Sequence, residues 1–288
     1  MRRLQSLAAA AVLALTGAAG TAGAQTDAPT QTATQTATEP RTWLQLQATS
    51  ASWRMQTRGD YYFSQQSTPP LQLESELGLP EGGTISGIAF GRRIGQRWRI
   101  ELEHTSSRRR GGTVLQREVA ADGVLFRAGT PIQSDVKLST LRVNGGVSLW
   151  MSPEAEFGLT FGGEWVELAR RFEGSGVPDF APPQQAPSAQ RTSSRDTAPI
   201  PVLGLYGHYA FAPAWRVTSR AEFGVGGASY RKLSAGVQWR ATPHLALGAG
   251  YRQGSANLDV LFGFIGCCTH LVLDYQAHGP ALSLNLSF

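Results

Sequence analysis

The sequence predicts an all-β protein: an antiparallel up-and-down transmembrane β-barrel of about ten strands. Three observations lead to this prediction. Segments in which apolar and polar residues alternate recur from residue 43 to the last residue, as in strands whose side chains point alternately to opposite faces. The connections alternate between short and long, as in barrels with short turns at one end and long loops at the other. Aromatic residues gather near the segment ends, where indole rings prefer the membrane interface.

Residues 1–24 have the features of a signal peptide. Met1-Arg2-Arg3 is a basic start, an Ala/Leu-rich run continues to about Ala19, and Ala22-Gly23-Ala24 is a small-x-small cleavage site. An anchoring helix is the alternative, but the apolar run is shorter than the ~20 residues that a membrane span needs. Cleavage removes two arginines and lowers the net charge from +5 to +3. This modest charge does not indicate a nucleic-acid partner.

Residues 25–40 are rich in Thr, Gln, Ala and Pro, a composition that predicts a disordered periplasmic lead-in. The barrel is then expected over residues 41–288. The two cysteines, Cys267 and Cys268, are adjacent, and a disulfide between sequence neighbours is strained. Because neither CxxC pairs nor Cys/His metal spacings occur, the sequence indicates no metal site and no cofactor.

Ten segments are expected to be strands. They are Trp43–Gln56, Thr84–Arg92, Arg97–Thr105, Val136–Trp150, Ala155–Arg170, Ile200–Phe211, Trp215–Gly226, Lys232–Arg240, His244–Arg252 and Leu271–Phe288. Long polar loops are expected over Thr57–Gly83, Ser106–Asp135, Arg171–Pro199 and Gln253–His270. A hairpin arm above the membrane, within Thr113–Pro131, leaves eight or twelve strands open as alternatives.

Predicted strands have one apolar face and one charged face. In Arg97–Thr105, for example, Trp98, Ile100 and Leu102 alternate with charged residues. The charged face does not fit the core of a soluble sandwich, but it fits a barrel with a polar lumen and a lipid-facing exterior. Eight charged residues are expected to form a network in this lumen: Arg99, Glu101, Glu103, Arg142, Glu164, Arg216, Arg220 and Glu222.

Two interpretations of this charged lumen remain open. Because buried charges must be paired, the residues can form ion pairs that fill a narrow barrel with its own side chains. Alternatively, they line a narrow passage for small solutes, in which rings of charge set the selectivity. Glu101 and Arg142, on adjacent strands, are then the expected constriction pair.

Catalysis has little support in the sequence. His104, Asp135, His270 and Asp274 could meet at the outer rim of the barrel, which is the basis of a third interpretation as a lipid- or peptide-hydrolysing enzyme. No nucleophile motif such as GxSxG occurs. No catalytic residue is therefore assigned.

Basic and aromatic residues mark the two expected edges of the membrane. Guanidinium groups bind phosphate in a bidentate manner, so basic residues at the outer ends are candidates for contact with lipopolysaccharide: Arg108, Arg109, Arg110, Arg170, Arg171, Arg231 and Lys232. Loop charge that only solvates the rim is the alternative. Interface aromatics are expected at Trp43, Trp53, Trp98, Trp150, Trp165, Trp215, Trp239 and Phe288.

Two motifs resemble those of a known class of proteins. Ala281–Phe288 alternates and ends on Phe, and is similar to the terminal signal that the barrel-assembly machinery recognises. Glu74-Ser-Glu-Leu-Gly-Leu79, followed by Arg97-Trp-Arg-Ile-Glu-Leu-Glu103, resembles small proteobacterial outer-membrane β-barrel proteins of the OmpA-, OmpX- and OmpW-like class, many of which carry an acidic-Leu-Gly-Leu element in the first loop.

This resemblance implies a fold and a location, the bacterial outer membrane, and no shared catalytic residues. It also implies contact with outer-membrane lipid and with the assembly machinery through Phe288. Taken with the residues, it favours a monomer with a structural or surface-interaction role.

Overall fold

The structure is a computed structural model that describes residues 41–61, 70–178, 186–225, 229–264 and 267–288. Side chains are described in these ranges except at residues 58–61, 259–264 and 267–272. The predicted signal peptide and lead-in, residues 1–40, lie outside the described part, as do the side chains of Cys267 and Cys268. Within the described part, no helix is both long and apolar enough to cross a membrane.

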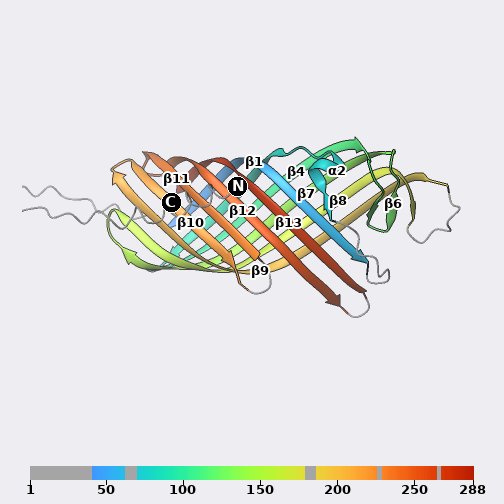
Figure 1. Cartoon of the computed structure of the whole chain (residues 1–288). Helices are drawn as coiled ribbons and strands as arrows, with labels where there is room; N and C mark the ends of the chain where they lie inside the picture. Colours follow the sequence, from blue (N-terminus) through green and yellow to red (C-terminus); the bar gives the residue numbers. More distant parts are fainter. Residues whose placement is uncertain (1–40, 62–69, 179–185, 226–228, 265–266) are drawn as a thin grey trace, which may run out of the picture. The chain divides into compact units, whose positions relative to one another are not determined.

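Ten antiparallel strands form a closed barrel (Figure 1). Each strand pairs with the next in the ring, and pairing of the first with the last closes it. The ring consists of β1 (Thr42–Tyr61), β3 (Gly82–Ile94), β4 (Trp98–Val114), β7 (Pro131–Met151), β8 (Ala155–Pro178), β9 (Ser188–Ala212), β10 (Trp215–Gly224), β11 (Ser229–Thr242), β12 (Leu245–Phe264) and β13 (Cys267–Ser287). The prediction of a ten-stranded up-and-down barrel is confirmed, and the alternatives of eight and twelve strands are wrong.

Four short elements lie at the outer end of the barrel, away from the short turns. β2 (Leu71–Gln72) pairs with β1 and leads into the helix α2 (Leu73–Leu77). β5 (Val119–Ala121) and β6 (Val124–Phe126) form a hairpin, and β6 pairs with the end of β8. The hairpin expected within Thr113–Pro131 is therefore present, and it leaves the number of strands in the ring unchanged.

The strands extend much farther than the sequence predicted. β8 continues to Pro178 and β9 begins at Ser188, so most of the expected loop Arg171–Pro199 is strand. β12 and β13 likewise remain paired as far as Phe264 and Cys267, inside the expected loop Gln253–His270.

The extensions were not predicted because the apolar residues change from the outward face to the inward face along the strand, as β8 shows. Near the short turn, large apolar side chains point outward and are 39–44% exposed: Phe157, Leu159, Phe161 and Trp165. Farther along, apolar side chains point inward and are 1–2% exposed: Val166, Leu168 and Phe172. Only the first half has the outward apolar band that lipid requires. The second half, with a charged exterior, continues the barrel beyond the membrane.

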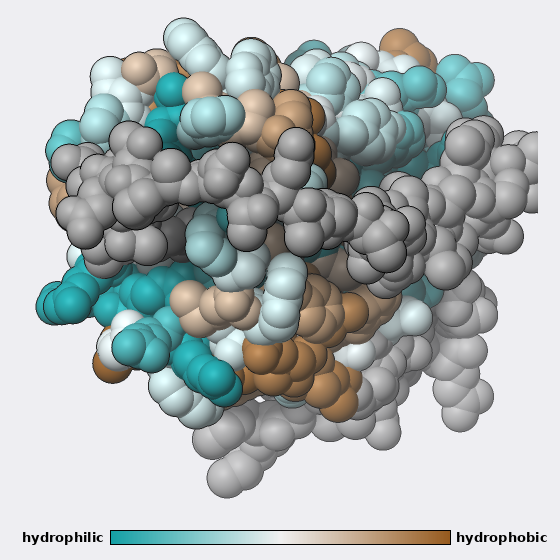
Figure 2. Space-filling view, turned by 90° about the vertical axis from the view of Figure 1, so that its left-hand side faces the viewer, coloured by the Kyte–Doolittle hydropathy of each residue, from teal (hydrophilic) through white to brown (hydrophobic). Residues whose placement is uncertain are grey.

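Most of the expected interface aromatics point outward: Trp98, Trp150, Trp165, Trp215, Trp239 and Phe288. Trp43 and Trp53 do not, and their placement at the interface is wrong. Trp53 is only 6% exposed, inside the barrel. Trp43 lies opposite Gly91 on the inner face of the wall. Both occupy the positions of β1 that alternation sends inward. Figure 2 shows the short-turn end, where hydrophobic and hydrophilic side chains lie next to one another on the described surface.

Candidate functional site

A first cluster of polar side chains fills the lumen near the short turns. Glu156 accepts hydrogen bonds from Arg93 at 2.6 Å, from Ser148 at 2.6 Å and from Tyr206 at 2.9 Å. The Arg99 guanidinium lies over the Tyr206 ring, 3.1 Å from its centroid. These contacts join five consecutive strands of the ring, from β3 to β9. Sequence reasoning included Arg99 but missed the partners Arg93 and Tyr206, whose inward positions follow from the same alternation.

A second cluster lies deeper in the lumen, around Arg142. This guanidinium donates hydrogen bonds to Glu103 and to Glu222, and all three side chains are buried. Glu222 also accepts from Nε of Arg220 at 2.8 Å. Arg220 in turn pairs with Glu101 at 2.6 Å. Each carboxylate thus faces a guanidinium, as buried charges require.

The expected constriction pair, Glu101 and Arg142, is not formed. Strand register is the cause, because Glu103 lies directly opposite Arg142 while Glu101 lies opposite Asn144. Glu101 pairs instead with Arg220 and, at 3.4 Å, with Arg99.

Glu164 and Arg216 complete the predicted lumen set. Glu164 accepts a hydrogen bond from the Tyr230 hydroxyl at 2.6 Å. Arg216 donates from Nε to the Gln238 side chain at 2.7 Å. Lys232 was expected among the basic residues at the outer ends of the strands, which we call the outer collar. It enters the lumen instead, where its ammonium lies 3.8 Å from Glu164. Its assignment to the collar is wrong, because alternation from the outward Trp239 places position 232 inside.

Beyond the charged clusters, the lumen is filled by an apolar core that sequence reasoning missed. Leu73 and Leu77 of α2 are completely buried in it. Strands around the ring contribute further members: Met55, Leu138, Val166, Leu168, Phe172, Ile200, Leu258 and Leu273. The barrel interior therefore has two layers. Ion pairs lie at the level of the outward apolar band near the short turns, which we call the apolar belt, and apolar packing lies beyond it.

The acidic-Leu-Gly-Leu element, residues 74–79, forms and anchors α2. Glu74 accepts hydrogen bonds from Nη1 of Arg109 at 2.6 Å and from the Met55 backbone N–H at 2.9 Å. Gly78, with φ of +67°, ends the helix in the left-handed conformation that favours glycine. Arg109 is 4% exposed, with its guanidinium over the Trp53 ring. Arg109 therefore docks α2, and its expected place on the outer collar is wrong.

The other arginines expected on the outer collar lie on different faces of the barrel wall. Arg170 is largely buried, and it pairs with Asp196 at 2.7 Å and with Asp122 at 3.5 Å. Its side chain therefore belongs mostly to the interior. The remaining candidates lie on the outward face: Arg108, Arg110, Arg171 and Arg231.

Arg108, Arg110 and Arg171 belong to a larger group of charges on the outer face of β4, β7, β8 and β9, which we call the outer-wall patch. Its cations are Arg108, Arg110, Lys137, Arg171, Arg191 and Arg195, and its anions are Asp135, Glu167 and Glu173. Sequence reasoning missed Lys137, Arg191 and Arg195. The patch has six cations against three carboxylates, a net charge of +3.

Asp135 is the centre of one part of this patch. Arg108 lies 2.5 Å and Arg110 3.0 Å from its carboxylate. The hydrogen bond from Arg108 lowers the pKa of Asp135 more than partial burial raises it, and the bond from Arg110 adds to the lowering.

The residues considered for catalysis are not brought together. His104, Asp135 and Asp274 lie on β4, β7 and β13, and both β1 and β3 separate β13 from β4. The fourth, His270, has its side chain outside the described part. In the described ranges, no group of three or more His, Cys, Asp or Glu could hold a metal ion.

Comparison with known proteins defines the class by its fold. No family model and no curated protein matches the sequence. The structure is similar to the outer membrane protease OmpT from Escherichia coli, with 10% identity over 87% of this chain and 98% of that chain and a TM-score of 0.55. Ail, the attachment invasion locus protein of Yersinia pestis, matches with 9% identity over 85% and 99% of the two chains and a TM-score of 0.29.

Neisserial surface protein A matches with 12% identity over 86% of this chain and 97% of that chain and a TM-score of 0.29. The likeness to OmpT, together with the closed ring of ten strands, shows the fold of the small outer-membrane β-barrel proteins.

Proposed function

We propose that the protein is a bacterial outer-membrane barrel, closed to solutes, that acts through its outer wall by binding the phosphate groups of lipopolysaccharide. This proposal rests on the outer-wall patch, which carries a net charge of +3 and lies just beyond the apolar belt. Its most exposed arginines, Arg110, Arg191 and Arg195, have side chains 62–71% exposed.

The chemistry of the patch fits a phosphorylated lipid surface. In an outer leaflet, lipopolysaccharide phosphates would lie directly beyond the apolar belt, at the level of the patch. Guanidinium groups match phosphate through two parallel hydrogen bonds. Near an anionic membrane surface, each Lys or Arg contributes about 1 kcal/mol to the attraction.

The two-layered interior supports a closed lumen over the alternative of a passive pore. Conduction needs a continuous wet path, whereas α2 and the apolar core fill the lumen beyond the paired charges. The separation of His104, Asp135 and Asp274 gives no support to a hydrolase. We therefore favour a non-enzymatic, monomeric interaction barrel.

The proposal includes an orientation and a route to the membrane. The short turns would face the periplasm, after export through a cleaved signal peptide ending at Ala24. Phe288, whose backbone hydrogen-bonds with Thr42 and so helps to close the ring, would present the terminal signal to the assembly machinery before closure.

Binding of refolded protein to immobilised lipopolysaccharide tests the proposed contact. The variant Arg110→Gln/Arg191→Gln/Arg195→Gln removes three exposed arginines of the patch. A matched control, Arg41→Gln/Arg92→Gln/Arg97→Gln, removes three exposed arginines at the short-turn end. At roughly 1 kcal/mol for each arginine, the patch variant should bind about a hundredfold more weakly. Equal binding by both variants, or equal binding to dephosphorylated lipopolysaccharide, would contradict the proposal.

A further inference from the structure

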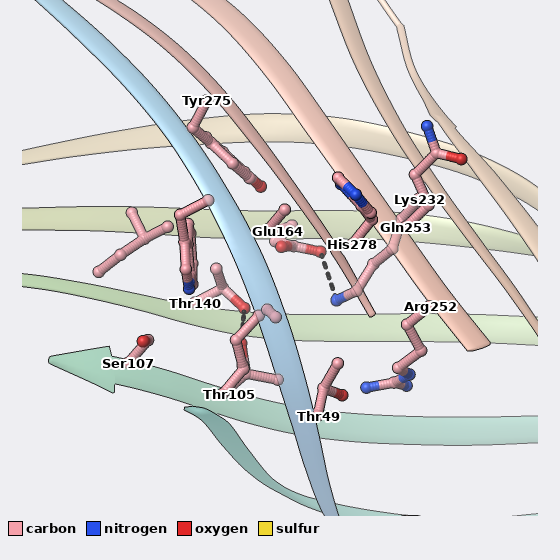
Figure 3. Close-up of a pocket in the computed structure, with 16 residues that line it drawn as sticks. Thr49, Thr105, Ser107, Thr140, Glu164, Lys232, Arg252, Gln253, Tyr275 and His278 are labelled. Carbon is pink, nitrogen blue, oxygen red and sulfur yellow. Dashed lines mark hydrogen bonds and ion pairs between the residues drawn. The ribbon is translucent and has the colours of Figure 1, made fainter. Parts of the chain in front are cut away.

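A small cavity of about 60 Å³ lies where the charged clusters meet the apolar core. Lys232 and Arg252 enter it from β11 and β12, and Thr49, Thr105 and Glu164 lie around the same space (Figure 3). Because Lys232 pairs in register with Gly254, the two cations are diagonal neighbours on adjacent strands. Like charges at such positions repel each other.

Neither cation of the cavity makes a hydrogen bond with a described residue. The Lys232 ammonium lies 3.7 Å from Glu103 and 3.8 Å from Glu164, and Nη2 of Arg252 lies 3.6 Å from Glu103. Hydrogen bonds from nitrogen to oxygen are normally 2.7–3.2 Å long. Both side chains keep about a fifth of their surface accessible, 20% and 22%, although they line the interior.

The nearby carboxylates are already engaged by other donors. Glu103 accepts hydrogen bonds from Arg142 and, at 2.7 Å, from the Gln47 side chain. Glu164 accepts from the Tyr230 hydroxyl. The long contacts to Lys232 and Arg252 therefore leave the donor capacity of both cations unused.

The connected charges of the lumen do not balance. Five cations, Arg99, Arg142, Arg220, Lys232 and Arg252, face four carboxylates, Glu101, Glu103, Glu164 and Glu222. This leaves one positive charge in excess in this network of ion pairs, and an uncompensated charge is costly inside a protein.

We propose that the cavity binds one small monovalent anion, an inorganic ion or a short carboxylate, between Lys232 and Arg252. The anion would balance the excess charge and occupy the unused donors of both cations. Trp53 also lines the cavity, and its buried indole N–H has no hydrogen-bond partner in the described part of the chain. Since a water needs roughly 10–15 Å³ of such space, the cavity limits the anion to about four heavy atoms.

Unfolding in urea, followed as nitrate replaces gluconate at constant ionic strength, tests this site. Nitrate fits the cavity, whereas gluconate is too large. Lys232→Met removes the excess charge. Gly254→Val fills the cavity while keeping every charge, because a Cβ atom on Gly254 meets no atom within 4 Å. Arg231→Met, which removes the neighbouring exposed cation, is the matched control.

The wild type and Arg231→Met should show an unfolding midpoint that rises with nitrate and saturates. Lys232→Met and Gly254→Val should show no such rise. A wild-type midpoint independent of nitrate, or the same saturating rise in Gly254→Val, would overturn the proposal. If Lys232→Met fails to fold, crystals of the wild type grown in bromide decide: an anomalous peak beside Lys232 and Arg252 supports the site, and its absence refutes it.

Discussion

Arg109 on the inner face of β4 donates a hydrogen bond from Nη1 to Oε1 of Glu74 in α2, at 2.6 Å. Glu74→Gln would leave this buried guanidinium without a counter-ion. Removing one partner of a buried ion pair costs about 3–5 kcal/mol, and we expect a loss of this size in the free energy of unfolding in detergent micelles. The control is Glu81→Gln, at an exposed glutamate just after the α2 segment. Equal losses in both variants would show that the pair does not anchor α2.

The close approach of α2 to β4 leads to a second prediction. A Cβ atom on Gly111 would overlap the carbonyl group of Gly78. Gly111→Ala should therefore displace α2, lower the free energy of unfolding by about 1–3 kcal/mol and speed proteolysis between residues 70 and 80. Gly82→Ala is the matched control, since a Cβ atom there meets nothing within 4 Å. If both variants resist protease like the wild type, the docking is looser than described.

Arg142 bridges two carboxylates of the lumen, since it donates to both Glu103 and Glu222. Arg142→Met removes the guanidinium that bonds to two buried carboxylates, and we expect a loss of about 3–5 kcal/mol in the free energy of unfolding. Urea unfolding monitored by heat-modifiable migration on gels measures it. Arg54→Met, on the exposed outer face of β1, should change stability by less than about 1 kcal/mol. If Arg142→Met unfolds at the same urea concentration as the wild type, the lumen charges are hydrated individually and do not depend on this pairing.

Asp135 on the outer wall should titrate abnormally. Its pKa is lowered in the folded state, chiefly by the hydrogen bond from Arg108. Such a group stabilises the fold above its unfolded pKa, about 3.9, and this contribution is lost as pH falls through the folded pKa. Carboxyl NMR should give a pKa below about 3.9 in the wild type and a higher one in Arg108→Gln. Lys137→Gln should leave it nearly unchanged. An unaltered pKa in Arg108→Gln would contradict the assigned pairing.

The number of strands was predictable because each strand carries an apolar band on one face near its short turn. Phe157, Leu159 and Phe161 on β8 show this directly, with Gly158 and Thr160 between them. The class of fold therefore follows from local alternation alone.

The outer halves of the strands were missed because the apolar side chains there change faces. On β8, apolar positions shift from the outward Trp165 to the inward Val166 and Leu168, so the outward band ends and the segment resembles a polar loop. Recognising that the strands continue would have placed Arg109 inside, since it has the same parity as Glu103.

The partners within the lumen depend on contacts that local sequence does not contain. Arg142 and Glu222 are 80 residues apart in the chain. Their strands, β7 and β10, are separated in the ring by β8 and β9, so the two side chains meet only inside the closed barrel. Register, not residue type, also decides that Arg142 pairs with Glu103 rather than Glu101.

Conductance across a planar lipid bilayer tests the central claim, a lumen filled by paired charges and an apolar core, most directly. The refolded wild type should insert and give no current steps above the baseline, while a known porin in the same apparatus gives them. Stable, repeated current steps from the wild type would show an open path through the barrel and contradict the two-layered interior.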